Sequence, residues 1–294
     1  MPLKTLAPVA RSREEIRAWI QERRGEGHTI GFVPTMGALH DGHLSLVQTA
    51  LEHADLAVVS IFVNPTQFAP GEDYDTYPRA ETSDLKQLKT AGAALAYCPG
   101  VEDMYPPGDS TRVRVEGLSS VLDGAFRPHF FEGVATIVAR LFAHVSPDVA
   151  VFGEKDYQQL RIIQRMTEDF GLPVKVIGAP TVREADGLAM SSRNAYLTDE
   201  ERARASTFAQ ALTRAVSEIE SGARVADARD RAELAIIDAG FGSVDYVSAC
   251  HADTLVEWED GPAPVGEAGR LLAAARIGDT RLIDNFPILR PANN

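Results

Sequence analysis

Two histidines separated by two residues are the strongest indication of chemistry in this sequence. His40 and His43 end the stretch Pro-Thr-Met-Gly-Ala-Leu-His-Asp-Gly-His at 34–43, which joins a strand-like run to a helix-like run. The pair therefore lies where a helix should begin, and backbone N–H groups there lack internal partners and favour anions. Imidazoles add donors that gain or lose a proton near neutral pH. This combination predicts a phosphate-binding site.

Two other interpretations of the histidine pair remain open. A His-x-x-His pair can ligate zinc, and it can equally be two surface or capping histidines. No third ligand cluster lies nearby in the sequence, and Gly37 and Gly42 permit the tight turns that bring backbone close to a ligand. We therefore favour the phosphate loop.

Further candidate groups follow three other segments. Asn64 and Gln67 come after a buried strand-like run, and their amides can hold polar substrate groups without adding charge, although Asn-Pro also starts turns. Lys155 can neutralise phosphate charge beside Asp156 at the next helix start; a capping acid next to a solvated lysine is the alternative. The Met-Ser-Ser-Arg-Asn segment at 190–194 offers two hydroxyls and a guanidinium to triphosphate oxygens, or is simply a linker.

Two acids are further candidates because phosphate ligands such as nucleotides carry Mg²⁺. Glu81 and Asp84 can help hold this ion on a nucleotide. Acids at this spacing more often lie on the exposed side of a helix, so we assign no metal ligands among the side chains.

The elements that must position these groups alternate between strands and helices up to about residue 180. Expected strands cover 29–33, 56–63, 93–98, 148–152 and 174–177. Expected helices follow a capping box at Ser12 and Glu15 and cover 44–51, 84–91, 134–145 and 156–170. The alternation predicts an α/β fold with a mainly parallel sheet. Ligands collect at the carboxyl ends of such strands, so we expect the candidate segments to meet there.

The pattern changes after residue 180. Thr198 and Glu201 form a second predicted capping box, opening a helix to about 221, and another helix should cover 225–239. Strand-like runs follow at 244–250, 271–277 and 280–283. We therefore predict a nucleotide-binding domain at 1–180 and a smaller α+β domain at 181–294.

Composition excludes several classes of function. The net charge of −13 argues against non-specific binding to nucleic acid or an anionic membrane, and an anionic substrate needs a local positive pocket. Cys98 and Cys250 form no C-x-x-C pair, which favours two reduced packing cysteines. No signal peptide is evident, and the most apolar run, 56–63, is too short to span a bilayer. We therefore expect a cytoplasmic protein.

Together these motifs resemble the pantothenate synthetase (pantoate–β-alanine ligase) family. This family belongs to the nucleotidyltransferase superfamily, which includes the class I aminoacyl-tRNA synthetases. His-Asp-Gly-His at 40–43 resembles the superfamily His-x-Gly-His signature, and 190–194 resembles its Lys-Met-Ser-Lys-Ser-type loop. Asn-Pro-Thr-Gln-Phe at 64–68 and Gly-Glu-Lys-Asp-Tyr-Gln-Gln-Leu at 153–160 narrow the resemblance to the ligase family.

The resemblance implies a Rossmann-like N-terminal domain, a smaller C-terminal lid domain and a homodimer. It implies that His43 is the proton donor, that Gln67 and Gln159 hold pantoate, and that Gln67 also lies near β-alanine. Asn64 stays a further substrate-binding candidate because of its position after the strand-like run. Phosphate oxygens would meet His40, His43, Lys155, Ser191, Ser192 and Arg193. The full set of implied ATP contacts is Met36, Gly37, Ala38, Leu39, His40, Asp41, Gly42, His43, Gly153, Glu154, Lys155, Asp156, Val182, Met190, Ser191, Ser192 and Arg193.

The implied reaction has two steps. Pantoate attacks the α-phosphorus of Mg-ATP, and the β-alanine amine then attacks the resulting pantoyl adenylate, giving pantothenate and AMP. Two rivals are a nucleotidyltransferase that stops at a nucleotide-containing product and a regulatory nucleotide-binding protein without catalysis. A tRNA synthetase is disfavoured by the acidic charge.

One segment departs from the family pattern. The family usually has Arg-Pro-x-His-Phe before the Gly-Val that starts the next helix, whereas this chain has Arg-Pro-His-Phe-Phe at 127–131. The histidine comes one position early, so no role is assigned to His129.

Overall fold

The chain divides into two compact units. The computed structural model describes residues 6–69 and 71–291. The first unit takes the described residues of Met1–Ser119, Arg127–Glu154 and Ile162–Pro180, and the second takes those of Ser120–Phe126, Lys155–Arg161 and Thr181–Asn294. The boundary at residue 180 stays a prediction. Two short segments before it, 120–126 and 155–161, group with the second unit.

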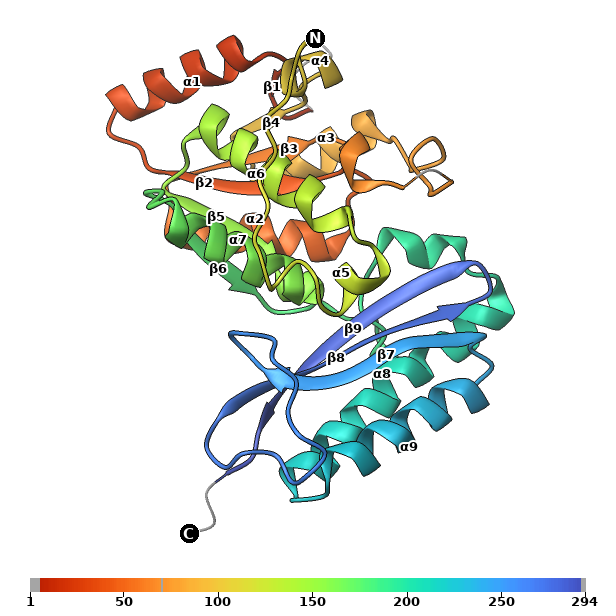
Figure 1. Cartoon of the computed structure of the whole chain (residues 1–294). Coiled ribbons are helices and arrows are strands. Elements are labelled where there is room, and N and C mark those ends of the chain that lie inside the picture. Colours follow the sequence, from red (N-terminus) through yellow and green to blue (C-terminus); the bar gives the residue numbers. More distant parts are fainter. Residues whose placement is uncertain (1–5, 70, 292–294) are drawn as a thin grey trace. The chain divides into compact units, whose positions relative to one another are not determined.

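The first unit contains a six-stranded parallel sheet (Figure 1), which confirms the predicted fold class. Its strands are β1 (Val9–Ala10), β2 (Ile30–Thr35), β3 (Leu56–Ile61), β4 (Leu95–Tyr97), β5 (Val149–Gly153) and β6 (Lys175–Ala179). The spatial order is β1-β4-β3-β2-β5-β6, so the direction of progression reverses between β2 and β5. Such a reversal creates a crevice at the carboxyl ends of the two neighbouring strands.

Five helices before residue 180 are close to those expected from the sequence, whereas the four-residue helices at 101–104 and 123–126 were not predicted. The helices before residue 180 are α1 (Arg13–Gly25), α2 (Asp41–His53), α3 (Glu81–Thr90), α4 (Val101–Met104), α5 (Asp123–Phe126), α6 (Phe130–Val145) and α7 (Tyr157–Asp169), with the 3₁₀ turns η1 (Pro65–Gln67) and η2 (Glu154–Asp156). Strand β2 runs to Thr35, beyond the expected end at Val33, because Pro34 and Thr35 still pair with β3. Two-residue β1 was not predicted because it is too short to show a period.

Helices cover both faces of the sheet (Figure 1), and successive side chains of a strand point to opposite faces. Val33 and Val59 are fully buried in the core that α2 and α3 cover. Phe32 points to the opposite face of the sheet. Its ring packs edge-on against that of Phe142 of α6, with the ring centroids 6.4 Å apart. Helices on both faces are what a parallel sheet requires, because both of its faces are apolar.

The second unit contains a three-stranded antiparallel sheet and two long helices. These are α8 (Asp199–Glu220), α9 (Val225–Asp238), β7 (Ser243–His251), β8 (Ala268–Ile277) and β9 (Thr280–Leu289), with the 3₁₀ turn η3 (Ser192–Tyr196). The capping box is confirmed: Thr198 Oγ1 accepts from the Glu201 N–H at 3.3 Å, and the Glu201 carboxylate accepts from the Thr198 N–H at 2.8 Å. Strand β9 extends past the expected end at 283 because residues 284–289 continue the antiparallel pairing with β8.

The two faces of this small sheet differ in polarity. One face packs against α8 and α9 through buried residues such as Phe208 and Leu271. Polar side chains point to the other face, and Arg281, Asn285 and Arg270 there contact the segments at 120–126 and 155–161. The polar face of the sheet therefore binds two segments that come before residue 180 in the sequence.

Candidate active site

The histidine loop, residues 36–43, connects β2 to α2. His40 is the N-cap residue, and its carbonyl accepts from the N–H groups of His43 and Leu44 at 2.8 and 3.1 Å. The two imidazole rings lie with their centroids 4.1 Å apart. His43 Nδ1 accepts from the His40 backbone N–H at 3.4 Å, so the neutral ring carries its proton on Nε2. The predicted position of the pair at a helix start is thus confirmed.

A buried carboxylate organises this loop from behind. Gly37 and Ala38 have φ values of 85° and 50°, in the left-handed region. The N–H groups of Ala38 and Leu39 donate to Asp84 Oδ2 and Oδ1 at 3.0 and 2.9 Å, and Asp84 is only 1% exposed. Burial raises the pKa of Asp84, although both hydrogen bonds oppose that shift. A side chain at Gly37 would meet the same carboxylate, with its Cβ 3.1 Å from Asp84 Oδ2.

The two acids that were considered for Mg²⁺ have other partners. Both oxygens of Asp84 accept backbone N–H groups, and Glu81 pairs with Arg11 at 2.5 Å. Within residues 6–69 and 71–291, no group of three or more His, Cys, Asp or Glu side chains is arranged to hold a metal ion. Asp84 is therefore a loop-organising residue in this structure.

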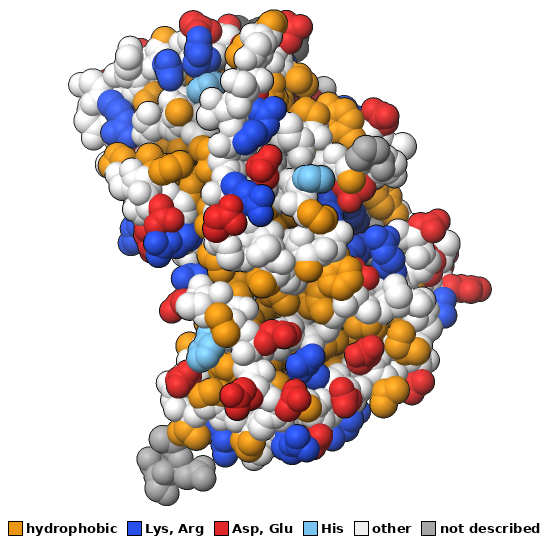
Figure 2. Space-filling model, in the orientation of Figure 1, with side chains coloured by type: hydrophobic (Ala, Val, Ile, Leu, Met, Phe, Trp, Pro, Cys, Tyr) orange, Lys and Arg blue, Asp and Glu red, His pale blue; other side chains and the backbone are white. Residues whose placement is uncertain are grey.

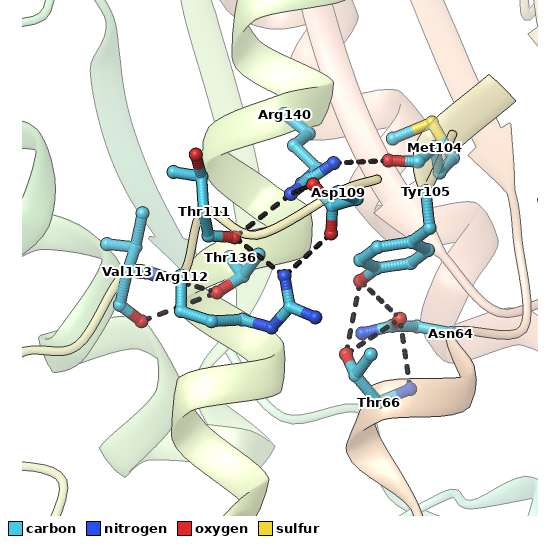
Figure 3. A network of polar contacts seen from close by, with 10 residues as sticks. All are labelled: Asn64, Thr66, Met104, Tyr105, Asp109, Thr111, Arg112, Val113, Thr136 and Arg140. Atoms are coloured by element: carbon cyan, nitrogen blue, oxygen red, sulfur yellow. Dashed lines mark hydrogen bonds and ion pairs between the residues drawn. The ribbon is translucent and has the colours of Figure 1, made fainter. Parts of the chain in front are cut away.

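The amide turn, residues 64–67, follows β3 and presents the second candidate group. Asn64 is 1% exposed, and its Nδ2 donates to Gln67 Oε1 at 3.0 Å and to the Gly133 carbonyl at 3.2 Å. Its Oδ1 accepts from the Thr66 N–H and the Tyr105 hydroxyl at 3.3 and 2.7 Å (Figure 3). The polar atoms of Asn64 are thus all hydrogen-bonded within the protein, and its role in holding substrate stays a prediction.

Helix α6 comes exceptionally close to this turn. A Cβ atom on Gly133 would lie 2.4 Å from the Thr66 carbonyl oxygen, so only glycine fits without moving the backbone. The close approach also lets the Gly133 carbonyl accept from Asn64. The amide turn is therefore fixed by the helix as well as by its own hydrogen bonds.

Lys155 and Asp156, the last two residues of the turn η2, group with the second unit. The Lys155 carbonyl accepts from Asn285 Nδ2 at 2.9 Å, and Asn285 Oδ1 accepts from Arg270 Nε at 2.7 Å. The Arg270 guanidinium lies over the Tyr157 ring, 4.1 Å from its centroid. Lys155 Nζ is 3.9 Å from Asp156 Oδ1. Asn285 thus holds the Lys155 backbone and Arg270 holds the Tyr157 ring, so the lysine side chain extends from a turn of fixed conformation.

Two adjacent glutamines at the start of α7 have different environments. Gln158 is 3% exposed; its Nε2 donates to the Val121 carbonyl at 2.7 Å and its Oε1 accepts from the Asp123 N–H at 3.1 Å. The Gln159 side chain is half-buried and makes no hydrogen bond with the part of the chain that the structure describes. Gln158 is thus held by hydrogen bonds within the protein, whereas a ligand role for Gln159 stays a prediction.

The last candidate segment, 190–193, follows a short hairpin closed by the Arg183–Ala189 bridge and runs into η3, which begins at Ser192. The Met190 N–H donates to the Val182 carbonyl at 3.0 Å, and Ser191 Oγ accepts from the Arg193 N–H at 3.2 Å. Arg202 holds the hairpin by pairing with Glu184 and Asp186, and it lowers the pKa of Asp186. Sequence motifs alone did not indicate this anchor.

The sequence-predicted residues fall into two groups, one in each unit. The first contains residues 36–43, the amide turn and Gly153–Glu154. The histidine loop follows β2, and Gly153 is the last residue of the neighbouring strand β5. The second contains 155–156, Gln159, Val182 and 190–193. His129 lies at the N-cap of α6 without a capping hydrogen bond from its side chain.

Fold and site together define a Rossmann-like nucleotide-binding α/β protein. The strand order reverses beside a helix start that carries two imidazoles, which is where such sheets bind phosphate groups. Comparison with known proteins narrows this class. The model of the pantoate-beta-alanine ligase family matches residues 8–287, so the chain belongs to this family and the resemblance inferred from its motifs is confirmed.

Individual relatives cover nearly the whole chain. A pantothenate synthetase from Hyphomonas neptunium is 53% identical over 283 residues, which are 96% of this chain and 97% of that protein. The pantothenate synthetase from Caulobacter vibrioides is 52% identical over 281 residues, covering 95% of this chain and 96% of that protein.

Solved structures agree with this result. A crystal structure of pantothenate synthetase from Thermus thermophilus has a TM-score of 0.88 at 46% identity, covering 95% of this chain and 98% of that chain. A pantoate-beta-alanine ligase from Francisella tularensis, crystallised with beta-gamma ATP and beta-alanine, has a TM-score of 0.78 at 32% identity, covering 95% and 97%.

Proposed function

We propose that this protein joins pantoate to β-alanine at the expense of ATP, giving pantothenate, AMP and pyrophosphate through a pantoyl-adenylate intermediate. The observation that carries the proposal is the family match over residues 8–287, which includes every candidate segment. The family member from Francisella tularensis that was crystallised with beta-gamma ATP and beta-alanine supports two of the substrates.

In the first step a pantoate carboxylate oxygen attacks the α-phosphorus of ATP. The bond from this phosphorus to the bridging oxygen breaks, and pyrophosphate leaves. Stabilising the developing charge on phosphate oxygens is the main task of the protein in such a transfer. The groups suited to it are His40, His43, Lys155, Ser191, Ser192 and Arg193. His43 would donate through Nε2, since its Nδ1 accepts a backbone N–H.

ATP would enter as its Mg²⁺ complex, with the ion held mainly by the triphosphate. The described residues contain no cluster of three potential metal ligands, and Asp84 is occupied by two N–H groups. Mg²⁺ commonly binds through substrate phosphates and water in this way. Its contribution would be to neutralise phosphate charge.

In the second step the β-alanine amine attacks the carbonyl carbon of the adenylate. The bond to the AMP oxygen breaks, the amide forms, and the amine loses its proton. Pantoate would be held by Gln67 and Gln159. Neither side chain adds charge beside the reacting carboxylate, which suits a hydroxy acid better than a phosphorylated acceptor.

A product assay separates this proposal from its rivals. Enzyme, Mg-ATP, pantoate and β-alanine should yield pantothenate, AMP and pyrophosphate in equal amounts, with no pantothenate when any substrate is omitted. A nucleotidyltransferase would make a stable nucleotide-containing product without needing the amine. A regulatory protein would bind ATP without releasing pyrophosphate, and either result would refute the ligase proposal.

We also propose a cytoplasmic homodimer with no nucleic-acid or membrane partner. On the face that Figure 2 draws, Lys and Arg side chains are interspersed with Asp and Glu, which supports the absence of a basic nucleic-acid surface there. No helix among the described residues is both long and apolar enough to cross a membrane. Sedimentation analysis at micromolar concentration tests the dimer directly.

A further inference from the structure

A tyrosine behind the amide turn connects it to helix α6. Tyr105 follows α4, about 40 residues beyond the amide turn in sequence, and its hydroxyl donates to Asn64 Oδ1 at 2.7 Å. The Tyr105 hydroxyl oxygen also lies 3.1 Å from Thr66 Oγ1 (Figure 3). Burial raises the pKa of Tyr105, so the phenol keeps its proton and can donate at neutral pH.

The orientation of the Asn64 amide is determined by groups that have only one hydrogen-bonding role. The Thr66 backbone N–H can only donate, which places Oδ1 at that end; the Gly133 carbonyl can only accept, which places Nδ2 at the other. Nδ2 then donates to Gln67 Oε1 at 3.0 Å. This bond directs the Gln67 amide so that Nε2 is the end left for a ligand.

Gln67 therefore offers donors rather than acceptors. It is 9% exposed, and its Nε2 makes no hydrogen bond with residues 6–69 or 71–291. Two N–H groups in this position suit a carboxylate or hydroxyl oxygen. Reversing the amide would place an acceptor there and repel a carboxylate.

Tyr105 is itself fixed from α6. The Arg140 guanidinium lies over its ring, 4.8 Å from the centroid, and donates to the Met104 carbonyl at 2.5 Å. Arg140 also pairs with Asp109 (Figure 3). Gly133 and Arg140 are seven residues apart on one helix, so they share a face. One face of α6 thus clamps both the tyrosine and the amide turn.

We propose that Tyr105 is a positioning residue for the acid substrate: through Asn64 it holds the Gln67 amide with its N–H groups toward the pantoate oxygens. The proposal rests on the proposed role of Gln67 in the ligase reaction. It identifies a residue outside the substrate contacts that holds Asn64, and through it Gln67, in the orientation that the Thr66 N–H and the Gly133 carbonyl select.

The test compares two tyrosine variants in which only a hydroxyl is lost. Tyr105→Phe keeps the ring under Arg140, and its KM for pantoate should rise about tenfold while its KM for ATP stays within about twofold. Tyr97→Phe is the matched control, because Tyr97 is also buried and its hydroxyl lies 2.9 Å from His144 Nδ1. Its KM for pantoate should not change.

A double variant shows whether Tyr105 affects pantoate binding through Gln67. If Tyr105 acts through Gln67, adding Tyr105→Phe to Gln67→Ala should change the pantoate KM by less than about twofold. An unchanged pantoate KM in Tyr105→Phe, with a raised one in Gln67→Ala, would overturn the positioning role and leave the proposed function standing. Equal rises in the KM values of all three substrates would also overturn it. If Gln67→Ala binds pantoate normally, the Gln67 assignment and the positioning role both fail, although ligase activity persists.

Discussion

Replacing Asp84 with asparagine should loosen the histidine loop while leaving the fold intact. The carboxylate accepts the N–H groups of Ala38 and Leu39 at 3.0 and 2.9 Å, and it does so beside two successive residues with positive φ. Asparagine keeps one acceptor oxygen but turns an N–H₂ group toward the second backbone N–H. No other described side chain accepts either N–H group.

The expected loss of activity in Asp84→Asn can be calculated from the free energy of the hydrogen bond that is lost. A hydrogen bond to a charged acceptor contributes about 1.5–3 kcal/mol. If this free energy is lost from the ordered conformation of the histidine loop, kcat/KM for ATP should decrease about 10- to 100-fold, because each 1.4 kcal/mol corresponds to about a factor of ten. The effect should appear in the adenylation step, measured by stopped-flow release of pyrophosphate.

Asp55 provides a matched control. Its carboxylate also accepts a backbone N–H, from Thr29 at 2.8 Å, together with the Thr29 hydroxyl at 2.6 Å. It lies at the amino ends of β2 and β3, roughly 20 Å from their carboxyl ends for strands of this length. Asp55→Asn should leave kcat/KM for ATP unchanged. An Asp84→Asn protein with normal kcat/KM for ATP would refute the loop-organising role.

Three other perturbations test separate parts of the structure. Gly133→Ala should destabilise the protein by about 1–3 kcal/mol in urea titrations, since the new Cβ meets the Thr66 carbonyl at 2.4 Å, whereas Gly25→Ala, with open space around it, should not. Burial lowers the pKa of His144 from 6.5 to about 4, so the unfolded chain binds the extra proton between these values. Stability should therefore fall by up to about 3 kcal/mol as the pH decreases from 6.5 to 4, and a His144→Gln protein that kept this slope would disprove the assignment. His43→Ala should slow adenylation by about 10²- to 10³-fold at unchanged circular dichroism, and near-normal adenylation would remove its proposed role.

Much of the fold could be predicted because its signals are local. The capping box at Thr198 and Glu201 and the β-branched run of β3 each specify their element from adjacent residues. The histidine loop was equally accessible, since glycine and histidine types reveal a turn before a helix. Such signals depend on backbone preference and period, which a single sequence contains.

The supports of the site were not predictable because they are tertiary. Tyr105 and Asn64 are separated in the chain, and no spacing rule links them. Asp84 was recognised as an acid but not as the partner of two N–H groups, since that role requires the packing of α3 behind the loop. Lys155 and Gln159 group with the small sheet through contacts with Asn285 and Arg270 that only folding creates.

Pyrophosphate exchange tests the central claim most directly. Protein, Mg-ATP and labelled pyrophosphate are incubated with pantoate and without β-alanine, and label in ATP is counted. Adenylate formation is reversible before the amine arrives, so exchange should require pantoate and should be absent with other hydroxy acids or with no acid. A protein that makes pantothenate from all three substrates but shows no pantoate-dependent exchange would contradict the adenylate route.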